Sequence, residues 1–484
     1  MAYNRGVPEP PSRRDLLVGT LAAAAASTAT SGANPPPQSS GKPNIILIVA
    51  DQVRSDAVGA YGANPMAVTP NLDAMAKRGT LYRNFFTNHP VCSPSRACLF
   101  TGAYQSANGV WANAGKEIGL AQNIPTLATE FRKAGYSANY IGKWHLAKNA
   151  EGPVPPAGRG GFLDLWEASN ELENTTHPYE GDIYDGDGRP IHFENEYRVD
   201  FLTSRVQGFL KNTSKTSPFF LVASYLEPHQ QNDMQRMVAP KGYAEQFQNP
   251  FAPADLRELP GNWQQQLPDY YGCMKSVDEA VGEIRQSLID NGLDKNTIVI
   301  FTSDHGCHFM TRNTEYKRSV HDASLHVPLI AEGGIFDGGR EVLETVQMID
   351  LMPTLLNAAN VPVPGTVRGR NSLPLLNGHH ENWSNDVLVF LSEFWIARGL
   401  RTPDWSYSLA APRGTTPFKP APDASSYYSF QLYDNRADPN QLVNLAGRKE
   451  TSQVEPRLRA RLLELMKAAA DTPSELHPCQ YPYS

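Results

Sequence analysis

A cysteine, a proline two positions later and an arginine four positions later form the run Cys92-Ser93-Pro94-Ser95-Arg96. A single cysteine is most often a small buried thiol, so Cys92 alone predicts no chemistry. Carboxylate and amide oxygens suit a hard divalent cation, whereas an anion needs only local positive charge. Residues of both kinds follow apolar runs at four other places: Asp51 and Gln52, Lys143 and His145, His229, and Asp304 and His305.

The apolar runs before these polar residues are predicted to be strands. Asn44 to Ala50 is a continuous β-branched run, which is typical of a parallel strand buried on both faces. Similar runs cover residues 136–141, 218–225 and 297–302. Because open α/β sheets place their sites at the carboxyl ends of the strands, we expect the polar residues to meet at one edge.

Segments with helical signals alternate with these strands. Thr69 and Pro70 predict a helix start, with Thr69 as the N-cap, and Gly79 predicts its end. Residues 124–135 and 271–288 are the next predicted helices. The alternation predicts an α/β fold with a mainly parallel central sheet covered by helices on both faces.

Composition excludes several classes of protein. The chain has 484 residues, 43 basic and 50 acidic, and a net charge of −7. A nucleic-acid-binding protein is usually basic, so nucleic acid is not expected as a partner. Five cysteines without a Cys-x-x-Cys pair predict neither a disulfide framework nor a zinc site.

The first 33 residues have the pattern of an export signal. Arg13 and Arg14 precede a mildly apolar segment and an alanine run. The apolar stretch is too short for a membrane span, so we expect a twin-arginine-type signal over residues 1–33 and no integral membrane protein. A disordered tail with an accidental arginine pair is the alternative. Residues 34–43 are predicted to be a linker, and the mature protein is expected to be periplasmic or extracellular.

The run from Cys92 to Gly102 resembles the signature of the sulfatase family, which has an alkaline-phosphatase-like fold. The resemblance implies that Cys92 is oxidised to formylglycine by a formylglycine-generating enzyme that reads Pro94 and Arg96. It further implies one divalent cation, usually Ca²⁺ with Mg²⁺ or Mn²⁺ as alternatives. The matching metal positions are Asp51, Gln52, Cys92, Asp304 and His305.

The resemblance also implies roles for the other polar residues. Arg96 would steady the formylglycine, and Lys143 would neutralise a sulfate oxygen. His145 would serve as a base, and His229 would contact sulfate or protonate the leaving oxygen. Lys317 would protonate the leaving group, which favours a lowered pKa. The sequence does not separate Lys317 from its neighbours Arg318 and His321.

The resemblance extends over nearly the whole mature chain. It implies a catalytic domain over residues 44–384, including a helix near residues 346–355. It implies a smaller C-terminal subdomain over residues 385–484, with an antiparallel sheet and a helix over Glu455 to Ala470. Residues 170–200 and 230–267 are predicted to be substrate-selecting loops. Four polar residues there are expected to face solvent, with contact to a sugar as the alternative: Asn174, His177, Asp182 and Arg198.

The expected function is hydrolysis of a sulfate monoester, either a sulfated glycan or an aryl or alkyl sulfate. Many family members have an acid where this chain has Gln52, and an amide brings no charge to the cation. A phosphonate monoester or phosphodiester hydrolase of the same superfamily is therefore an alternative. A non-catalytic binder of sulfated glycans is another, disfavoured by the presence of every expected polar group.

Overall fold

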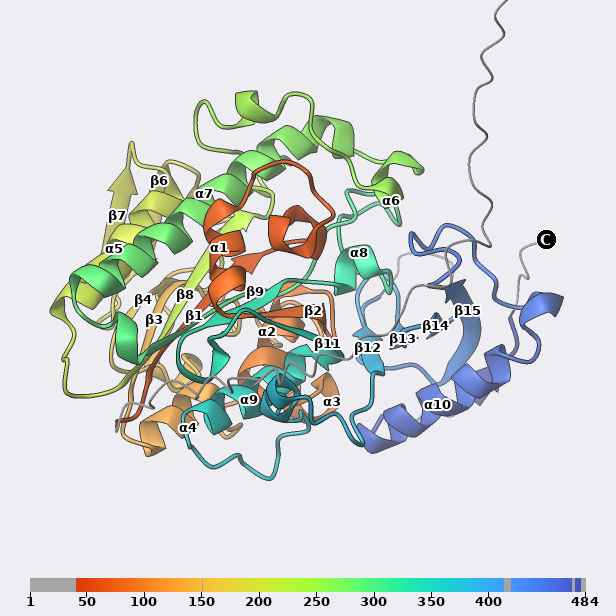
Figure 1. Cartoon of the computed structure of the whole chain (residues 1–484). Helices are drawn as coiled ribbons and strands as arrows, with labels where there is room; N and C mark the ends of the chain where they lie inside the picture. The colour runs from red at the N-terminus through yellow and green to blue at the C-terminus, as the bar shows by residue number, and fades with distance from the viewer. Residues whose placement is uncertain (1–40, 150, 413–418, 472–474, 480–484) are drawn as a thin grey trace, which may run out of the picture. The chain divides into compact units, whose positions relative to one another are not determined.

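A computed structural model describes residues 41–149, 151–412, 419–471 and 475–479. The predicted signal over residues 1–33 and most of the predicted linker lie outside these residues. The described part contains an 11-stranded sheet and a separate 5-stranded sheet, shown in Figure 1. The strands of the large sheet are β1 (Asn44–Asp51), β2 (Thr80–Phe86), β3 (Ser137–Lys143), β4 (Trp166–Ser169), β5 (Thr176–His177), β6 (Glu180–Tyr184), β7 (Pro190–Glu194), β8 (Phe219–Pro228), β9 (Thr297–Ser303), β10 (Leu329–Glu332) and β11 (Arg340–Gln347).

The centre of the large sheet is parallel. The strand order is β11-β2-β10-β9-β1-β8-β3-β4-β6-β5, with β7 paired to β6. Strand β1 lies between β8 and β9, and Ile46 pairs with Leu221 on one side and Val299 on the other. Strand β10 is antiparallel to both of its neighbours, and the β4–β7 edge is also antiparallel. The expected mainly parallel α/β fold is confirmed.

Helices cover both faces of this sheet (Figure 1). Alternate residues of β1 enter different clusters: Ile45 and Leu47 belong to one, and Ile46 and Ile48 to the other. The first cluster includes residues of α2 (Cys92–Thr101), α4 (Leu127–Lys133) and α9 (Leu351–Ala358), and the second includes residues of α1 (Pro70–Arg78), α5 (Arg198–Asn212) and α7 (Trp263–Asp290). Three short α-helices also lie in this part of the chain: α3 (Gln105–Asn108), α6 (Ala254–Arg257) and α8 (Asp322–Leu325). Several 3₁₀ turns are present as well, among them Met348–Asp350 before α9.

Several helix boundaries differ from the sequence prediction. The helix expected near residues 346–355 is α9, which begins only at Leu351, after β11 and a 3₁₀ turn. Helix α4 begins at Leu127, because the Thr126 side chain accepts a hydrogen bond from the Thr129 backbone N–H and caps the helix there. Helix α7 begins at Trp263, eight positions before the predicted start at Tyr271, and it includes Pro268. Pro268 lies in the second turn of α7, where a proline supplies no N–H to the carbonyl four residues earlier.

The predicted loops also hold regular structure. Residues 170–200 contain β5, β6, β7 and the start of α5, and the second predicted loop contains α6 and the start of α7. The antiparallel strands β5 to β7 are short, and β5 has only two residues. Such short elements have too few positions to show a clear alternation. The loop assignment was therefore wrong for residues 170–200, whereas most of residues 230–267 is irregular, as predicted.

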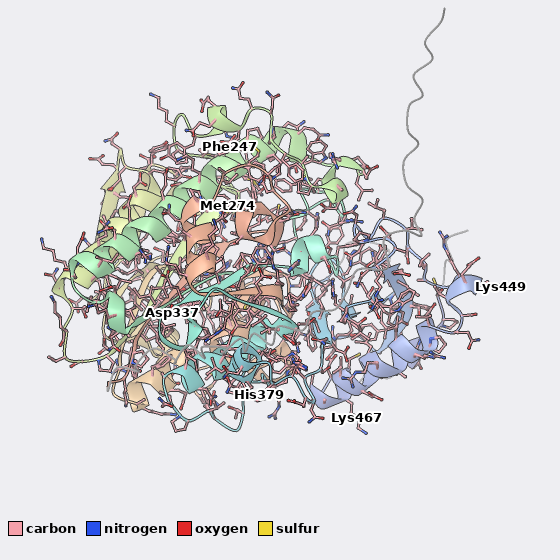
Figure 2. The ribbon with its side chains drawn as sticks, viewed as in Figure 1. Phe247, Met274, Asp337, His379, Lys449 and Lys467 are labelled. Carbon is pink, nitrogen blue, oxygen red and sulfur yellow. The ribbon has the colours of Figure 1, made fainter. Side chains whose placement is uncertain are left out.

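The smaller sheet consists of β12 (Val387–Leu391), β13 (Ala397–Arg401), β14 (Trp405–Ala410), β15 (Ser426–Asp434) and β16 (Glu475–His477). Its pairings are antiparallel except for β15 with β16. Helix α10 (Glu455–Ala468) packs Leu462 and Met466 against this sheet, as expected for the C-terminal segment. Figure 2 shows side chains filling the space between the ribbons, with Lys467 near the end of α10. The boundary at residue 385 stays a prediction.

A helix that crosses a membrane must be both long and apolar. None of the described helices is both long enough and apolar enough to cross a bilayer.

Candidate active site

Cys92 is the first residue of α2 and has no solvent-exposed surface. Lys317 Nζ lies 2.7 Å from its Sγ, His305 Nε2 lies 3.3 Å away, and Lys143 Nζ lies 3.8 Å away. Burial alone would raise the pKa of the Cys92 thiol, but these three groups together lower it well below its ordinary value. Position 92 is therefore a strongly electropositive place, and the N-terminus of α2 adds to it.

Two buried acids face the Cys92 side chain from different strands. Asp51 ends β1, and its Oδ1 lies 3.7 Å from Cys92 Sγ. Asp304 follows β9 directly and is also fully buried. Arg96 joins them, because its Nη2 lies 3.2 Å from Asp51 Oδ2 and its Nε lies 3.0 Å from Asp304 Oδ2. Burial and Cys92 would raise the pKa of Asp51, but Lys143, His229 and His305 lower it to about 2.

These acids belong to a group that fits a divalent cation. Ligand atoms of Asp51, Cys92, Asp304 and His305 all lie within 4.8 Å of one another. Gln52 supplies a further clue: its side-chain Oε1 is buried and has no hydrogen-bond partner among the described residues. Its Nε2 donates to Cys307 Sγ at 3.2 Å, which leaves the carbonyl oxygen as the free end. An orphaned amide oxygen beside two carboxylates is a donor set for a hard cation.

Two further histidines line the site at the ends of β3 and β8. His229 accepts from or donates to Tyr316 Oη at 3.0 Å through Nε2, and Lys317 Nζ lies 3.4 Å from the same nitrogen. His145 has a left-handed backbone conformation, with φ of 58°. Its Nδ1 is buried and has no hydrogen-bond partner in the described chain. His229 thus lies beside the Lys317 ammonium, and His145 Nδ1 lies 3.6 Å from Glu173 Oε1.

The structure separates Lys317 from its two neighbours. Lys317 is buried against Cys92, whereas Arg318 contacts Glu315 and Glu393, and His321 Nε2 lies 3.0 Å from Tyr433 Oη. Burial would lower the pKa of Lys317, but the Cys92 thiolate raises it above its ordinary value. The expectation of a lowered pKa is therefore wrong while position 92 is an ionised thiol. The negative charge of that thiolate is the physical reason.

Sequence reasoning missed one acid at the centre of the site. Glu173 Oε1 lies 2.7 Å from Lys143 Nζ, and the Glu173 side chain is 4% exposed. Its segment was assigned to a solvent-facing loop, and only the fold brings it to β3. Arg198 is a related error, because it is buried and contacts Glu227 at 2.8 Å. The other three residues expected in solvent, Asn174, His177 and Asp182, are exposed or half-exposed.

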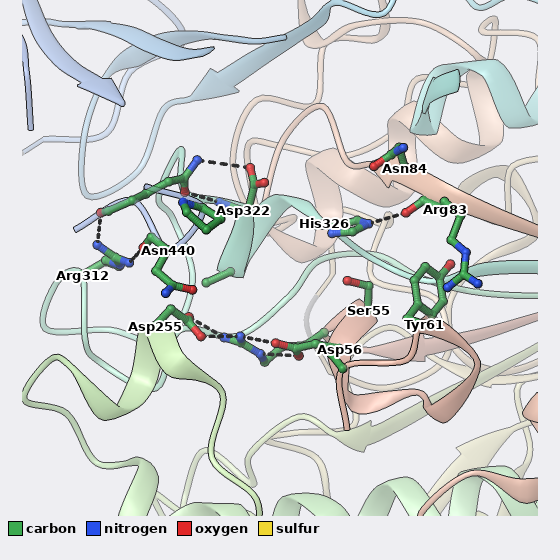
Figure 3. Close-up of a pocket in the computed structure, with 15 residues that line it drawn as sticks. Ser55, Asp56, Tyr61, Arg83, Asn84, Asp255, Arg312, Asp322, His326 and Asn440 are labelled. Carbon is green, nitrogen blue, oxygen red and sulfur yellow. Dashed lines mark hydrogen bonds and ion pairs between the residues drawn. The ribbon is translucent and has the colours of Figure 1, made fainter. Parts of the chain in front are cut away.

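A cavity of about 360 Å³ lies elsewhere (Figure 3). Arg54 lines it and contacts Asp56 and Asp255 at 2.6 and 2.8 Å. None of the predicted catalytic or metal-binding residues lines this cavity. The predicted site residues therefore lie in the buried cluster around Cys92 and not at this cavity.

Comparison with known proteins decides the family. A sequence profile of the family described as Sulfatase matches residues 43–361, which is more than half of the 484 residues. The chain belongs to the sulfatase family. A second profile, described as N-sulphoglucosamine sulphohydrolase, C-terminal, matches residues 314–468 of this sulfatase. Sulfatases hydrolyse sulfuric esters, and this protein is a hydrolase of that class.

Individual relatives share most of the chain length. An ulvan-active sulfatase from Formosa agariphila is 29% identical over 451 residues, covering 89% of this chain and 82% of the relative. The crystal structure of the putative sulfatase yidJ from Bacteroides fragilis has a TM-score of 0.76 at 25% identity, covering 89% of this chain and 96% of that one. A phosphonate monoester hydrolase of Agrobacterium radiobacter shares the fold, with a TM-score of 0.68 at 23% identity over 88% and 96% of the two chains.

Proposed function

We propose that this sulfatase hydrolyses a sulfate monoester of a glycan, or an aryl or alkyl sulfate, with a formylglycine made from Cys92 and one divalent cation. The observation that carries the proposal is the position of Cys92, at a helix N-terminus between Lys317, His305 and Lys143. Ca²⁺ is the favoured ion, with Mg²⁺ or Mn²⁺ as alternatives, and Asp51, Gln52, Asp304 and His305 are its proposed ligands. A formylglycine-generating enzyme is the proposed maturation partner.

The proposed roles of the residues follow from their contacts. A formylglycine at position 92 would supply the nucleophilic hydroxyl, and a cation held by Asp51, Gln52, Asp304 and His305 would lower the pKa of that hydroxyl. Lys143 and His229 bind the sulfate oxygens beside residue 92, and Arg96, which pairs with Asp51 and Asp304, steadies the formylglycine. Lys317 can deliver a proton to the leaving oxygen, because its ammonium lies within hydrogen-bond reach of the Cys92 side chain. His145 would accept the proton that is released when sulfate leaves residue 92.

The direct test is the mass of the peptide that contains residue 92. The protein is co-expressed with a formylglycine-generating enzyme, and conversion lowers the peptide mass by about 18 Da relative to cysteine. A Cys92→Ala variant is expected to lose hydrolysis of an aryl sulfate completely. An unmodified thiol in an active protein, or wild-type turnover by Cys92→Ala, would overturn the mechanism.

Gln52 supports one second candidate, a phosphonate monoester or phosphodiester hydrolase. The amide brings no negative charge to the cation, and the phosphonate hydrolase named above has the same fold. The two candidates are distinguished by comparing kcat/KM for 4-nitrophenyl sulfate with that for an aryl phosphonate monoester. A larger value for the sulfate supports the first candidate, and a larger value for the phosphonate supports the second.

Export through a twin-arginine-type signal is also part of the proposal, and it rests on Arg13 and Arg14. The wild-type protein is expected in the periplasm or medium without its first 33 or so residues. Replacing both arginines with lysine is expected to retain the full-length protein in the cytoplasm. Fractionation followed by N-terminal sequencing measures both outcomes, and equal export of the two forms would contradict the proposal.

A further inference from the structure

Glu173 is a buried carboxylate at the centre of a site that must bind an anion. One of its oxygens, Cys92 Sγ and a nitrogen of His229 all lie within 4.8 Å of one another. Burial would raise the pKa of Glu173, but Lys143, His145 and His229 lower it below its ordinary value. The side chain is therefore a fixed negative charge next to the place where sulfate binds.

The backbone holds Glu173 firmly in this position. The segments after β3 and β4 continue side by side, with Trp144 N donating to Ser169 O at 2.9 Å and His145 N donating to Asn170 O at 2.7 Å. Gln231 Nε2 then donates to the carbonyl of Glu173 itself at 3.0 Å. These bonds fix Glu173 relative to the residues that follow β3.

The contacts of Lys143 show how Glu173 restricts the orientation of the Lys143 ammonium. A lysine ammonium has three N–H donors. Asp51 Oδ2 and Glu173 Oε1 each lie 2.7 Å from Lys143 Nζ and take two of them. The remaining direction holds Cys92 Sγ at 3.8 Å. Without Glu173, the ammonium would have one fixed acceptor and could rotate about it.

We propose that Glu173 is a positioning residue that, together with Asp51, aims the third N–H of Lys143 at the reacting group on residue 92. This inference rests on the proposed sulfatase function and assigns a role to a residue outside the signature run. Aiming needs only a hydrogen-bond acceptor at position 173. The negative charge has a separate effect, because a carboxylate close to an anion site weakens ground-state binding of sulfate.

These two effects are separable with Glu173→Gln and Glu173→Ala. Glutamine keeps an acceptor oxygen and removes the charge, whereas alanine removes both. We expect kcat for an aryl sulfate to fall at least about tenfold in Glu173→Ala and to stay within about threefold of wild type in Glu173→Gln. Inorganic sulfate should bind both variants about threefold to tenfold more tightly than wild type, as measured by calorimetry.

Glu167→Gln is the matched control. Glu167 lies on β4 and pairs with Arg205, outside the cluster around Cys92, so its loss should change neither kcat nor sulfate binding by more than about twofold. A general loss of structure would instead lower kcat and weaken sulfate binding together. Circular dichroism and melting temperature are recorded for each variant.

Each outcome decides the matter. Unchanged kcat in Glu173→Ala, or an equal loss in Glu173→Gln and Glu173→Ala, would overturn the positioning role. Unchanged or weaker sulfate binding in both variants would overturn the charge effect. A wild-type protein that binds sulfate but hydrolyses no sulfate ester would instead count against the proposed function, and the calorimetric comparison would still test Glu173.

Discussion

Lys317 and Lys143 approach Cys92 from different elements and with different partners. Lys143 ends β3 and is held by two carboxylates, whereas Lys317 lies in the segment after β9 and contacts the imidazoles of His305 and His229. A lysine held by carboxylates keeps its proton and is suited to neutralising charge. A lysine among imidazoles is better suited to giving its proton away.

This difference predicts the effect of Lys317→Ala. Loss of a general acid typically costs about 100-fold to 10,000-fold in rate, and the loss grows as the leaving group becomes more basic. We therefore expect a larger fall in kcat/KM for an alkyl sulfate than for 4-nitrophenyl sulfate. The exposed Lys295→Ala is the control. An equal loss for the two esters would contradict the role of Lys317.

Gln52 carries a second residue-level prediction. Its orphaned Oε1 is expected to bind the cation, so Gln52→Ala should weaken calcium binding by about tenfold or more. Gln52→Asp adds a charged ligand and should strengthen it. The measurement is the rise in melting temperature as calcium is added to chelator-treated protein, because a ligand that binds the folded state stabilises it. Unaltered calcium dependence in both variants would show that Gln52 does not bind the ion.

The candidate site was largely predictable because its residues follow strong strand signals. Asp51, Lys143 and Asp304 each stand at the end of an apolar run, and the fold brings them together around Cys92. Glu173 follows the four-residue strand β4, which has no comparable signal. The direction of the Lys317 pKa shift was misjudged for another reason, since this pKa depends on Cys92, which is distant in sequence.

At the scale of elements, the N-terminus of helix α1 is capped by a residue distant in sequence and not by its own N-cap residue. Thr69 is at the N-cap position, as predicted, but its side chain makes no capping hydrogen bond. Asp278 of α7 serves instead, because its carboxylate accepts from Asn71 N at 3.0 Å and from Leu72 N at 2.8 Å. One helix therefore caps another across the same face of the sheet.

Asp278→Ala should expose the importance of this cap. It leaves backbone N–H groups of α1 buried without acceptors, which costs about 1–3 kcal/mol of unfolding free energy. Urea unfolding followed by circular dichroism measures the change. Glu283→Ala, on an exposed position of the same helix, should have little effect. Equal stability of the two variants would mean that the cap contributes nothing.

Long elements were predictable from sequence, and the edges of the sheet were not. Strands β1, β3, β8 and β9 have continuous apolar runs because they are buried on both faces. Strands β2 and β11 carry polar residues among apolar ones. In β11 even an apolar residue can face solvent, since Leu343 is 66% exposed. The antiparallel β10 has four residues and contributes little periodicity.

At the scale of the whole described chain, the two sheets share an apolar cluster. Phe86, Val320 and Leu325 from the larger part pack with residues of β12, β13 and β14. His321 lies beside this cluster and contacts Tyr433 of β15. It is one of several histidines whose pKa values burial lowers below the ordinary value: the buried His89, His308 and His321 and the half-buried His326.

These histidines predict sensitivity to acid. Each is neutral in the folded protein, while the unfolded chain binds a proton below about pH 6.5, so stability is lost as the pH falls below that value. His321→Gln removes one such group. Its unfolding free energy should fall less between pH 6.5 and pH 5 than that of the wild type, by about 2 kcal/mol. Urea unfolding at several pH values provides the comparison, and identical pH slopes would contradict the prediction.

The complete burial of Cys92 has a consequence for biosynthesis. A modifying enzyme must bind the polypeptide around the target cysteine, and in the folded chain the Cys92 side chain is not exposed to solvent. Under the proposed function, Cys92 must therefore be oxidised before the chain folds. A molecule that folds before this conversion would keep its thiol and be inactive, however stable it is. The specific activity of a preparation would then measure the fraction of chains that were converted before folding. Maturation enzyme added later could convert the remaining chains only after they had been unfolded.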